Sequence, residues 1–369
     1  MWFCIPPIGS NLTPLPDTAE VGGSKTEQSL STLNAVEFVA LISQATPEGL
    51  WPNKGILPPC SVLYLTLVRL FGSIGSRGRK MKFLQPAGWR EALEAKAAHP
   101  EAVPIFGGTD VMVELNFARG RPEAVLDLTC VPEIREWGED RGRLRVGAGV
   151  TYTRIIEEIG ERIRGLAMAS RTVGSPQIRN RGTVGGNLGT ASPAGDALPP
   201  LYASDAEVEV VSVEGSRRVP VAEFIVGPKR NVLEPNELIA AFHVPEAEGP
   251  QQYSKIGTRN AMVIAVCSFG LALHPEKRKV GTCLGSAAPT PVRAGDAERF
   301  IEGILEEGNV WESRAEIGAA ALGTFGELVG MVARPISDVR GSAAYRNHAV
   351  GVLARRTLKW AWEEYRRGE

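Results

Sequence analysis

Two segments of this sequence combine glycines with hydroxyl and carboxylate side chains at short spacing. The first reads Val103-Pro104-Ile105-Phe106-Gly107-Gly108-Thr109-Asp110, and the second spans residues 174–196. Because glycine has no side chain, backbone N–H groups at such positions can approach an anion closely, and a threonine hydroxyl adds another donor. The pattern favours the binding of a phosphate group.

The second segment is the denser of the two. It contains Gly182, Gly185, Gly186, Gly189 and Gly195, interleaved with Thr183, Asn187, Thr190 and Ser192. No regular secondary structure explains this composition, so we expect irregular backbone that approaches a ligand, with side chains completing the hydrogen bonds. The alternative is a long surface loop, and for the first segment it is an ordinary strand-ending turn.

Two common nucleotide-binding signatures are missing from the sequence. No G-x-x-x-x-G-K-[ST] run occurs, which excludes a P-loop. The nearest approach to G-x-G-x-x-G is Gly147-Ala148-Gly149, but Tyr152 takes the position of the third glycine. A side chain there prevents the close helix packing of a Rossmann site, so we exclude that fold as well.

Composition excludes further classes of protein. The 41 Lys and Arg residues nearly balance 42 Asp and Glu residues, so no global field attracts nucleic acid. Five scattered cysteines and four isolated histidines predict a reducing compartment, the cytoplasm, and no metal site. The apolar run at residues 61–74 contains Arg69 and is too short to span a bilayer, and the basic residues 77–80 follow it instead of preceding it. We therefore expect neither a transmembrane segment nor export.

The rest of the chain must supply elements that hold the two glycine segments. Residues 1–80 are rich in Pro, Gly, Ser and Thr and are typical of a poorly ordered extension, so we expect Met81 to be the physiological start. Thr151 or Thr153 is expected to cap a helix through Ile155 and Ile159. We expect helices over residues 88–98, 294–305 and 342–364, and strands over residues 102–106, 124–128, 144–146, 207–213, 217–219, 263–273 and 279–285.

These elements predict an α+β protein whose last part is an independent domain, in which a sheet is followed by helices.

The motifs also carry a family likeness. Phe106-Gly107-Gly108-Thr109-Asp110, followed by Gln177-Ile178-Arg179-Asn180-x-Gly182-Thr183-Val184-Gly185-Gly186-Asn187-Leu188, resembles the flavin subunits of molybdenum hydroxylases, of the carbon monoxide dehydrogenase medium-subunit and xanthine dehydrogenase type. Further similar motifs are Ala191-Ser192-Pro193-Ala194-x-Asp196, Lys255-Ile256-Gly257-x-Arg259, Pro289-Thr290-Pro291-Val292-Arg293-Ala294 and Ser337-Asp338-Val339-Arg340-Gly341-Ser342-x-x-Tyr345-Arg346. The likeness runs from about Met81 to the C-terminus.

The resemblance implies an FAD-binding fold of the PCMH type over residues 81–250, with two subdomains that divide near residue 137. A carbon monoxide dehydrogenase flavoprotein C-terminal domain over residues 251–369 would follow it. Residues 103–110 would wrap the diphosphate and the neighbouring hydroxyls of FAD, and residues 183–190 would supply the other half of this cradle. Val173 and Gly174 align with positions on the adenine side, and Leu238 and Ile239 with apolar contacts.

Three further positions follow from the same resemblance. Asp196 matches a residue that binds a cofactor hydroxyl, with capping of a helix near Ala197 as the alternative. Lys255 aligns with a lysine near the isoalloxazine ring, where a cation stabilises negative charge on reduction, and a surface lysine on a strand is the alternative. Ile264 matches a residue that covers one flavin face, with a core strand residue as the alternative.

Departures from the family pattern refine these expectations. Thr109 stands where covalently flavinylated relatives have histidine, so FAD is expected to be noncovalent. The isolated cysteines provide no additional iron–sulphur cluster. Arg179 and Arg181 are expected to be solvated, as most surface arginines are, and stay outside the expected site.

The implied function is that of an FAD-binding electron-transfer subunit with no catalytic residue and no metal ligand of its own. A large partner would hydroxylate a small molecule at molybdopterin, and 2Fe-2S clusters on a small partner would pass electrons to FAD. The acceptor would be NAD, a quinone or oxygen, and the assembly a dimer of heterotrimers. Two alternatives stay open: a self-contained flavin oxidoreductase of the same fold, and a non-catalytic assembly protein that has lost FAD.

Overall fold

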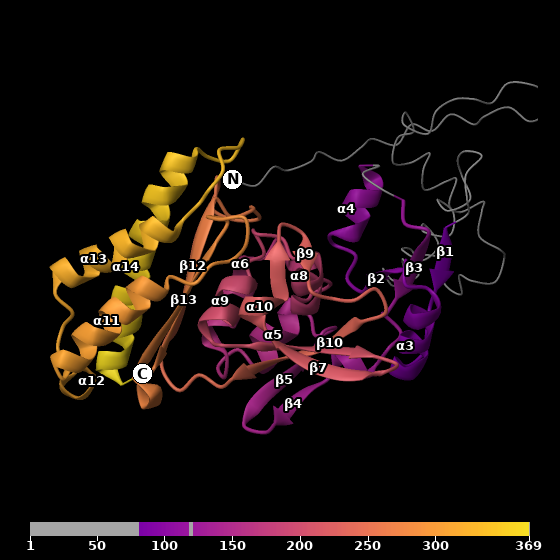
Figure 1. Ribbon diagram of the computed structural model, residues 1–369, viewed down its shortest axis with the longest axis horizontal. Helices are drawn as coiled ribbons and strands as arrows, with labels where there is room; N and C mark the ends of the chain where they lie inside the picture. Colours follow the sequence, from indigo (N-terminus) through magenta and orange to yellow (C-terminus); the bar gives the residue numbers. More distant parts are fainter. Residues whose placement is uncertain (1–80, 118–120, 369) are drawn as a thin grey trace, which may run out of the picture. The chain divides into compact units, whose positions relative to one another are not determined.

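The computed structural model describes residues 81–117 and 121–368 (Figure 1). These residues all belong to one compact unit of the chain, Gly75–Glu369. Their strands form sheets of three, five, three and two strands. The expectations about an extension over residues 1–80 lie outside the described residues.

The first sheet is parallel, with the strand order β1-β3-β2. Its elements are β1 (Lys82–Leu84), α3 (Trp89–Ala98), β2 (Val103–Ile105), α4 (Val111–Asn116), β3 (Ala124–Asp127) and the short helix η2 (Glu133–Arg135). All four residues of the central strand are buried, as expected when both faces of a parallel strand are covered. Leu93 of α3 and Leu126 of β3 belong to one hydrophobic cluster. The first glycine segment therefore leaves an edge strand of a packed sheet.

The second sheet is antiparallel, with the order β4-β5-β10-β6-β7. Its strands are β4 (Trp137–Asp140), β5 (Arg143–Gly147), β6 (Glu207–Ser212), β7 (Gly215–Pro220) and β10 (Leu238–Pro245). The segments between them form α5 (Tyr152–Glu158), α6 (Arg164–Thr172), α7 (Pro176–Arg179), α8 (Val184–Thr190), α9 (Leu198–Ala203), α10 (Val221–Phe224), β8 (Ile225–Gly227) and β9 (Arg230–Asn231). Strand alternation sends Val208 and Val210 into a core shared with Leu188 and Phe242.

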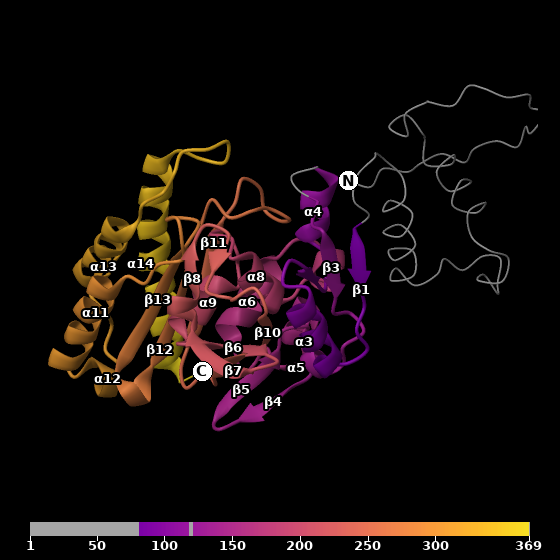
Figure 2. The same cartoon turned by 45° about the vertical axis from the view of Figure 1, so that its right-hand side comes forward.

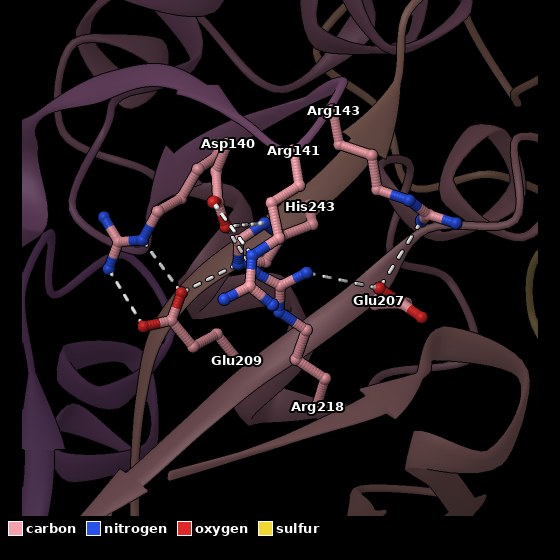
Figure 3. Close-up of polar contacts among 8 residues, drawn as sticks. Asp140, Arg141, Arg143, Glu207, Glu209, Arg218 and His243 are labelled. Atoms are coloured by element: carbon pink, nitrogen blue, oxygen red, sulfur yellow. Dashed lines mark hydrogen bonds and ion pairs between the residues drawn. The ribbon is translucent and has the colours of Figure 1, made fainter.

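The other face of this sheet carries a charged cluster, which we define as Asp140, Arg141, Arg143, Arg145, Glu207, Glu209, Arg218 and His243 (Figure 3). Glu209 accepts a hydrogen bond from Arg145 Nε at 2.8 Å, and its Oε2 also lies 2.8 Å from Nε2 of the fully buried His243. Opposite charges alternate across neighbouring strands, which stabilises strand pairing. We assign this cluster a structural role, because each of its carboxylates is paired with a basic side chain of the cluster.

The third sheet has the order β11-β12-β13 and is followed by helices. The elements are β11 (Gln251–Ile256), β12 (Cys267–His274), the short helix η3 (Pro275–Lys277), β13 (Lys279–Gly285), α11 (Gly295–Glu307), α12 (Val310–Ser313), α13 (Ala319–Val332) and α14 (Ala343–Arg367). In Figures 1 and 2 the helices α11, α13 and α14 lie along one face of this sheet. Phe269 and Phe325 meet there edge to face, with ring centroids 6.3 Å apart.

The opposite face of the third sheet packs on α9, and three glycines make this possible. We call Gly270, Gly281 and Gly285 the glycine face. A Cβ atom at Gly270 would lie 2.7 Å from the carbonyl carbon of Pro199, and one at Gly281 would lie 2.9 Å from that of Ala203. Both distances are too short for real atoms, so α9 sits directly against strand backbone.

The predicted α+β class is confirmed, and most expected elements are present. Thr151 caps α5 by accepting a hydrogen bond from Arg154 N. Two expectations were wrong: the second glycine segment contains the helices α7 and α8, and the strand expected from residue 263 begins only at Cys267. Helix α13 was not predicted, because its three glycines mask the helical pattern of its buried residues.

Candidate cofactor-binding site

The first glycine segment connects β2 to α4. Gly108 has a φ of +74°, which glycine adopts without strain. Its carbonyl accepts a hydrogen bond from Met112 N, whereas none of the N–H groups of residues 107–110 donates a hydrogen bond within the described part of the chain. Backbone N–H groups are obligatory donors, so four unpaired neighbours indicate a ligand or solvent as their partner.

The second glycine segment is built around helix α8. Thr183 caps this helix, its Oγ1 accepting a hydrogen bond from Gly186 N at 2.9 Å, while Val184 and Leu188 are buried in the core. Packing and the cap therefore outweigh the low helix propensity of glycine, which is why irregular backbone was the wrong expectation.

The glycines of α8 differ in what surrounds them. A Cβ atom at the buried Gly185 would lie 2.6 Å from Ala148 Cβ, so the fold itself requires glycine there. Gly186 and Gly189 are exposed, and a Cβ would meet only Thr183 Oγ1 at 3.2 Å or Ile239 Cδ1 at 3.8 Å. Since alanine is favoured over glycine in helices, the fold gives no reason for glycine at Gly189, and at Gly186 it gives only the tight contact with the capping hydroxyl. A ligand that approaches this surface closely accounts for both glycines.

The two glycine segments lie against each other. A Cβ atom at Gly107 would overlap the carbonyl oxygen of Arg181 and lie 2.7 Å from its carbon. Thr190 Oγ1 donates a hydrogen bond to Asp110 Oδ2 at 3.1 Å. The structure thus brings together residues that are about 80 positions apart, as a shared cradle requires.

Asp196 and Lys255 form a buried ion pair. Lys255 Nζ donates to Asp196 Oδ2 at 2.6 Å, and Tyr253 donates its hydroxyl to Asp196 Oδ1 at 2.9 Å. Burial raises the pKa of Asp196, whereas Lys255 beside it acts in the opposite direction. The alternative interpretations of both residues are therefore wrong. Asp196 caps no helix, because α9 has no side-chain cap. Lys255 is not a surface lysine, because its side chain is only 7% exposed.

The expected adenine side is held by an arginine that the sequence reading had left out. Gly174 has a φ of +45° and follows Val173, the C-cap of α6. Arg179 NH1 donates to the carbonyl oxygens of Val173 and Gly174, both at 3.1 Å. The expectation that Arg179 is simply solvated was therefore wrong, because this guanidinium fixes the turn.

The remaining expected residues lie in different surroundings. Leu238 is 2% exposed in the core beside α3, and Ile239 is half-buried and adjoins Gly189. Ile264 is 51% exposed and precedes β12. The alternative interpretation of Ile264 as a buried strand residue was therefore wrong. Ile105 is buried in β2, with Pro104 exposed.

Tyr152 is a further polar residue at this place that the sequence reading had missed. Its ring lies against Gly182, and its hydroxyl is buried without a hydrogen-bond partner among the described residues. Burial, followed by the charges of Asp196 and Asp110, raises the pKa of Tyr152 well above its ordinary value. The hydroxyl thus stays neutral beside the second glycine segment.

Other parts of the described chain offer no competing site. Residues 81–117 and 121–368 contain no group of three His, Cys, Asp or Glu side chains placed to hold a metal, and no helix long and apolar enough to cross a membrane. A hollow of about 520 Å³ lies between α13 and α14 and includes Gly326, Asn347 and His348, but no expected cofactor residue lines it.

The residues present fit a flavin dinucleotide. Unpaired amides at residues 107–110 suit a diphosphate, and the Cβ-free surface at Gly186 and Gly189 admits a ligand to the backbone of α8. Asp196 supplies an acceptor for a hydroxyl, and Lys255 a cation. These groups would hold FAD.

The fold and these two segments define a flavoprotein of the dinucleotide-binding class. Residues 79–247 match the family described as the FAD binding domain in molybdopterin dehydrogenase, and residues 252–361 match the CO dehydrogenase flavoprotein C-terminal domain. The xanthine dehydrogenase FAD-binding subunit of Escherichia coli O157:H7 is 30% identical over 73% of this chain and 92% of its own length. The chain therefore belongs to the FAD-binding subunits of the molybdenum hydroxylase family, and it is an oxidoreductase subunit.

Further relatives and solved structures agree. The nicotinate dehydrogenase FAD-subunit of Eubacterium barkeri is 31% identical over 61% of this chain and 80% of its own length. Quinoline 2-oxidoreductase from Pseudomonas putida 86 has the same fold, with a TM-score of 0.70 at 23% identity over 78% of this chain and 98% of that one. Carbon monoxide dehydrogenase from Hydrogenophaga pseudoflava gives a TM-score of 0.68 at 24% identity, covering 77% and 98%. The family resemblance and the predicted fold are thus confirmed.

Proposed function

We propose that this chain binds FAD noncovalently between its two glycine segments and relays electrons during the oxidative hydroxylation of a small molecule. Electrons would arrive from 2Fe-2S clusters on a small partner subunit and leave to an external acceptor. Hydroxylation would take place on a large, molybdopterin-binding partner. The complex would be a dimer of such heterotrimers in the cytoplasm.

One observation carries the cofactor part of this proposal. The four N–H groups of residues 107–110 have no partner in the described chain. The segment packs against Arg181, directly ahead of α8, whose exposed Gly189 the fold does not require. Backbone donors beside a Cβ-free surface suit a diphosphate lying along the chain. The names of the relatives, both FAD subunits of dehydrogenases, support the same cofactor.

The chain's own residues would bind and orient the cofactor. Bound FAD supplies the exchange between single-electron and two-electron transfer. Residues 107–110 and 183–190 would hold the diphosphate, and Val173 and Gly174 would lie on the adenine side. The exposed Ile264 would cover one flavin face and limit access of the acceptor.

The test uses the purified full chain. We expect a yellow protein, or one that becomes yellow with added FAD, whose flavin is released by acid and has the mass of FAD, not FMN. A chain that stays colourless and does not bind FAD would contradict the proposal and favour an assembly protein. Flavin that remains attached after acid treatment would contradict noncovalent binding.

Electron relay needs a second measurement. Full-length chain with FAD is mixed with a reduced 2Fe-2S ferredoxin, and flavin reduction is followed by its absorbance. Reduction without any added small-molecule substrate supports a relay. Reduction only by a small substrate added directly would favour a self-contained flavin oxidoreductase.

A further inference from the structure

The buried pair of Asp196 and Lys255 joins two separate parts of the chain. Asp196 lies between α8 and α9, within the FAD-binding match at residues 79–247. Lys255 and Tyr253 lie on β11, within the C-terminal match at residues 252–361. The side chains of Lys255 and Asp196 are 7% and 10% exposed, so water screens this contact little.

The same lysine reaches a second segment of the expected site. Its Nζ also lies 3.3 Å from the carbonyl oxygen of Thr172, the last residue of α6. Val173 and Gly174, on the expected adenine side, follow directly. One ammonium group therefore ties the turn after α6 to Asp196, although these residues are 24 positions apart.

The surroundings leave Asp196 little freedom to move. Helix α9 begins two residues later, and the glycine face holds its backbone against β12 and β13. Just before Asp196, the carbonyl of Pro193 accepts a hydrogen bond from Ser286 N at 2.9 Å. Residues of the third sheet thus hold the chain on both sides of Asp196.

We infer that Tyr253 and Lys255 act as a clasp between the two domains, which positions Asp196 and the Val173–Gly174 turn for the cofactor. Tyr253 is then a positioning residue for FAD, although it lies outside the dinucleotide domain. Lys255 acts mainly by holding two segments, in place of the redox-tuning role that the resemblance implies. This inference rests on the proposed function, namely that FAD binds between the glycine segments.

The clasp has a direct energetic basis. A buried carboxylate that loses its counter-charge becomes an uncompensated charge, which is strongly unfavourable. Removing Lys255 therefore forces Asp196 to turn toward water or take up a proton, and it releases the carbonyl of Thr172. Removing only the Tyr253 hydroxyl deletes one charge-assisted hydrogen bond and leaves the ion pair in place.

The test measures FAD affinity, thermal unfolding of the FAD-free chain, and flavin midpoint potential, all on the full chain. We expect Tyr253→Phe to raise the FAD Kd about tenfold and Lys255→Met about thirtyfold or more. With saturating FAD, the midpoint potential should stay at the wild-type value. Asp196→Asn combined with Lys255→Met should weaken binding by less than the product of the two single effects, because both substitutions remove the same ion pair.

Two matched controls separate the clasp from general effects. Tyr202→Phe removes another buried tyrosine hydroxyl, one without a partner in the described structure. Lys279→Met removes a lysine of β13, in the same sheet as Lys255, that is 64% exposed and pairs with Glu302 of α11. Neither should change the FAD Kd.

Three results would overturn the inference. A shifted midpoint potential with unchanged Kd in Lys255→Met would assign the lysine to redox tuning. An unchanged FAD Kd with a lower unfolding temperature in Lys255→Met would make the pair of Asp196 and Lys255 purely structural. If Lys255→Met does not fold, wild-type affinity in Tyr253→Phe alone refutes the clasp. A wild-type chain that fails to bind FAD would instead refute the proposed function, and the inference with it.

Discussion

Gly107 and Gly189 allow the cradle to be tested by two substitutions whose effects on stability have opposite signs. In Gly107→Ala the new Cβ would lie 2.7 Å from the carbonyl carbon of Arg181 and overlap its oxygen. Ordinary contacts are about 3.5–4 Å, so the two segments must separate by about 1 Å. Overpacking of this kind costs about 1–3 kcal/mol in the free energy of unfolding. We expect the FAD-free chain to be destabilised by that amount and to bind FAD at least tenfold more weakly.

Gly189→Ala should behave differently. Its Cβ would meet only Ile239 Cδ1, at an ordinary 3.8 Å, and alanine is favoured over glycine within a helix by about 0.8–1 kcal/mol. The FAD-free chain should therefore become slightly more stable, while the methyl group occupies the surface that the cofactor needs. We expect weaker FAD binding from a more stable protein, a combination that general damage to the fold does not produce.

The assay is urea unfolding of the FAD-free full chain, together with titration of FAD followed by flavin fluorescence. Gly189 is a cleaner position than Gly186, where a Cβ would also press on the capping hydroxyl of Thr183 at 3.2 Å. Wild-type FAD affinity in Gly189→Ala would show that the cofactor does not lie on this surface of α8. Wild-type stability in Gly107→Ala would refute the close packing of the two segments.

Three further outcomes follow from contacts elsewhere in the structure. The hydrogen bond from His243 is the main cause that lowers the pKa of Glu209 to about 2, so the stability from this carboxylate is present above about pH 4.5 and is lost as the pH falls toward 2. After discounting for solvent, urea unfolding should show wild type losing about 1–2 kcal/mol more than Glu209→Gln between pH 6 and pH 3; equal losses would contradict this. Thr183→Ala removes the cap of α8 and should lower the free energy of unfolding in urea by about 1 kcal/mol and weaken FAD binding. An unchanged urea concentration at the unfolding midpoint would show that the cap is dispensable. Gly281→Ala forces a Cβ to within 2.9 Å of the Ala203 carbonyl carbon and should lower the unfolding temperature by several degrees, which a calorimetric scan checks.

Much of the fold follows from local patterns in the sequence. The alternating residues of β6 and the capping hydroxyl of Thr151 are signals within a few residues, and both elements form as expected. Helix α8 does not follow from such signals, because its glycines disfavour a helix locally. It forms because Thr183 caps it and Leu188 is buried in a core assembled from distant strands.

The residues of the site also fall into those that the local sequence reveals and those that depend on tertiary contacts. The two glycine segments were recognisable from composition, and the structure brings them into contact. The pairing of Lys255 with Asp196 was not predictable, because 59 positions separate them and nothing in either local sequence specifies the partner. The orphaned hydroxyl of Tyr152 was invisible for the same reason, since burial depends on tertiary packing.

The glycine face has a consequence for how this chain can be altered or recombined. Ordinary interfaces tolerate substitutions because side chains adopt new rotamers, but a Cβ at Gly270 or Gly281 would meet the main chain of α9, and no rotamer relieves that clash. A chimaera that joins residues 81–250 to the C-terminal part of another relative must therefore keep glycine at positions 270 and 281. Without these glycines, α9 could not pack against β12 and β13, and the two parts of the chimaera would not associate.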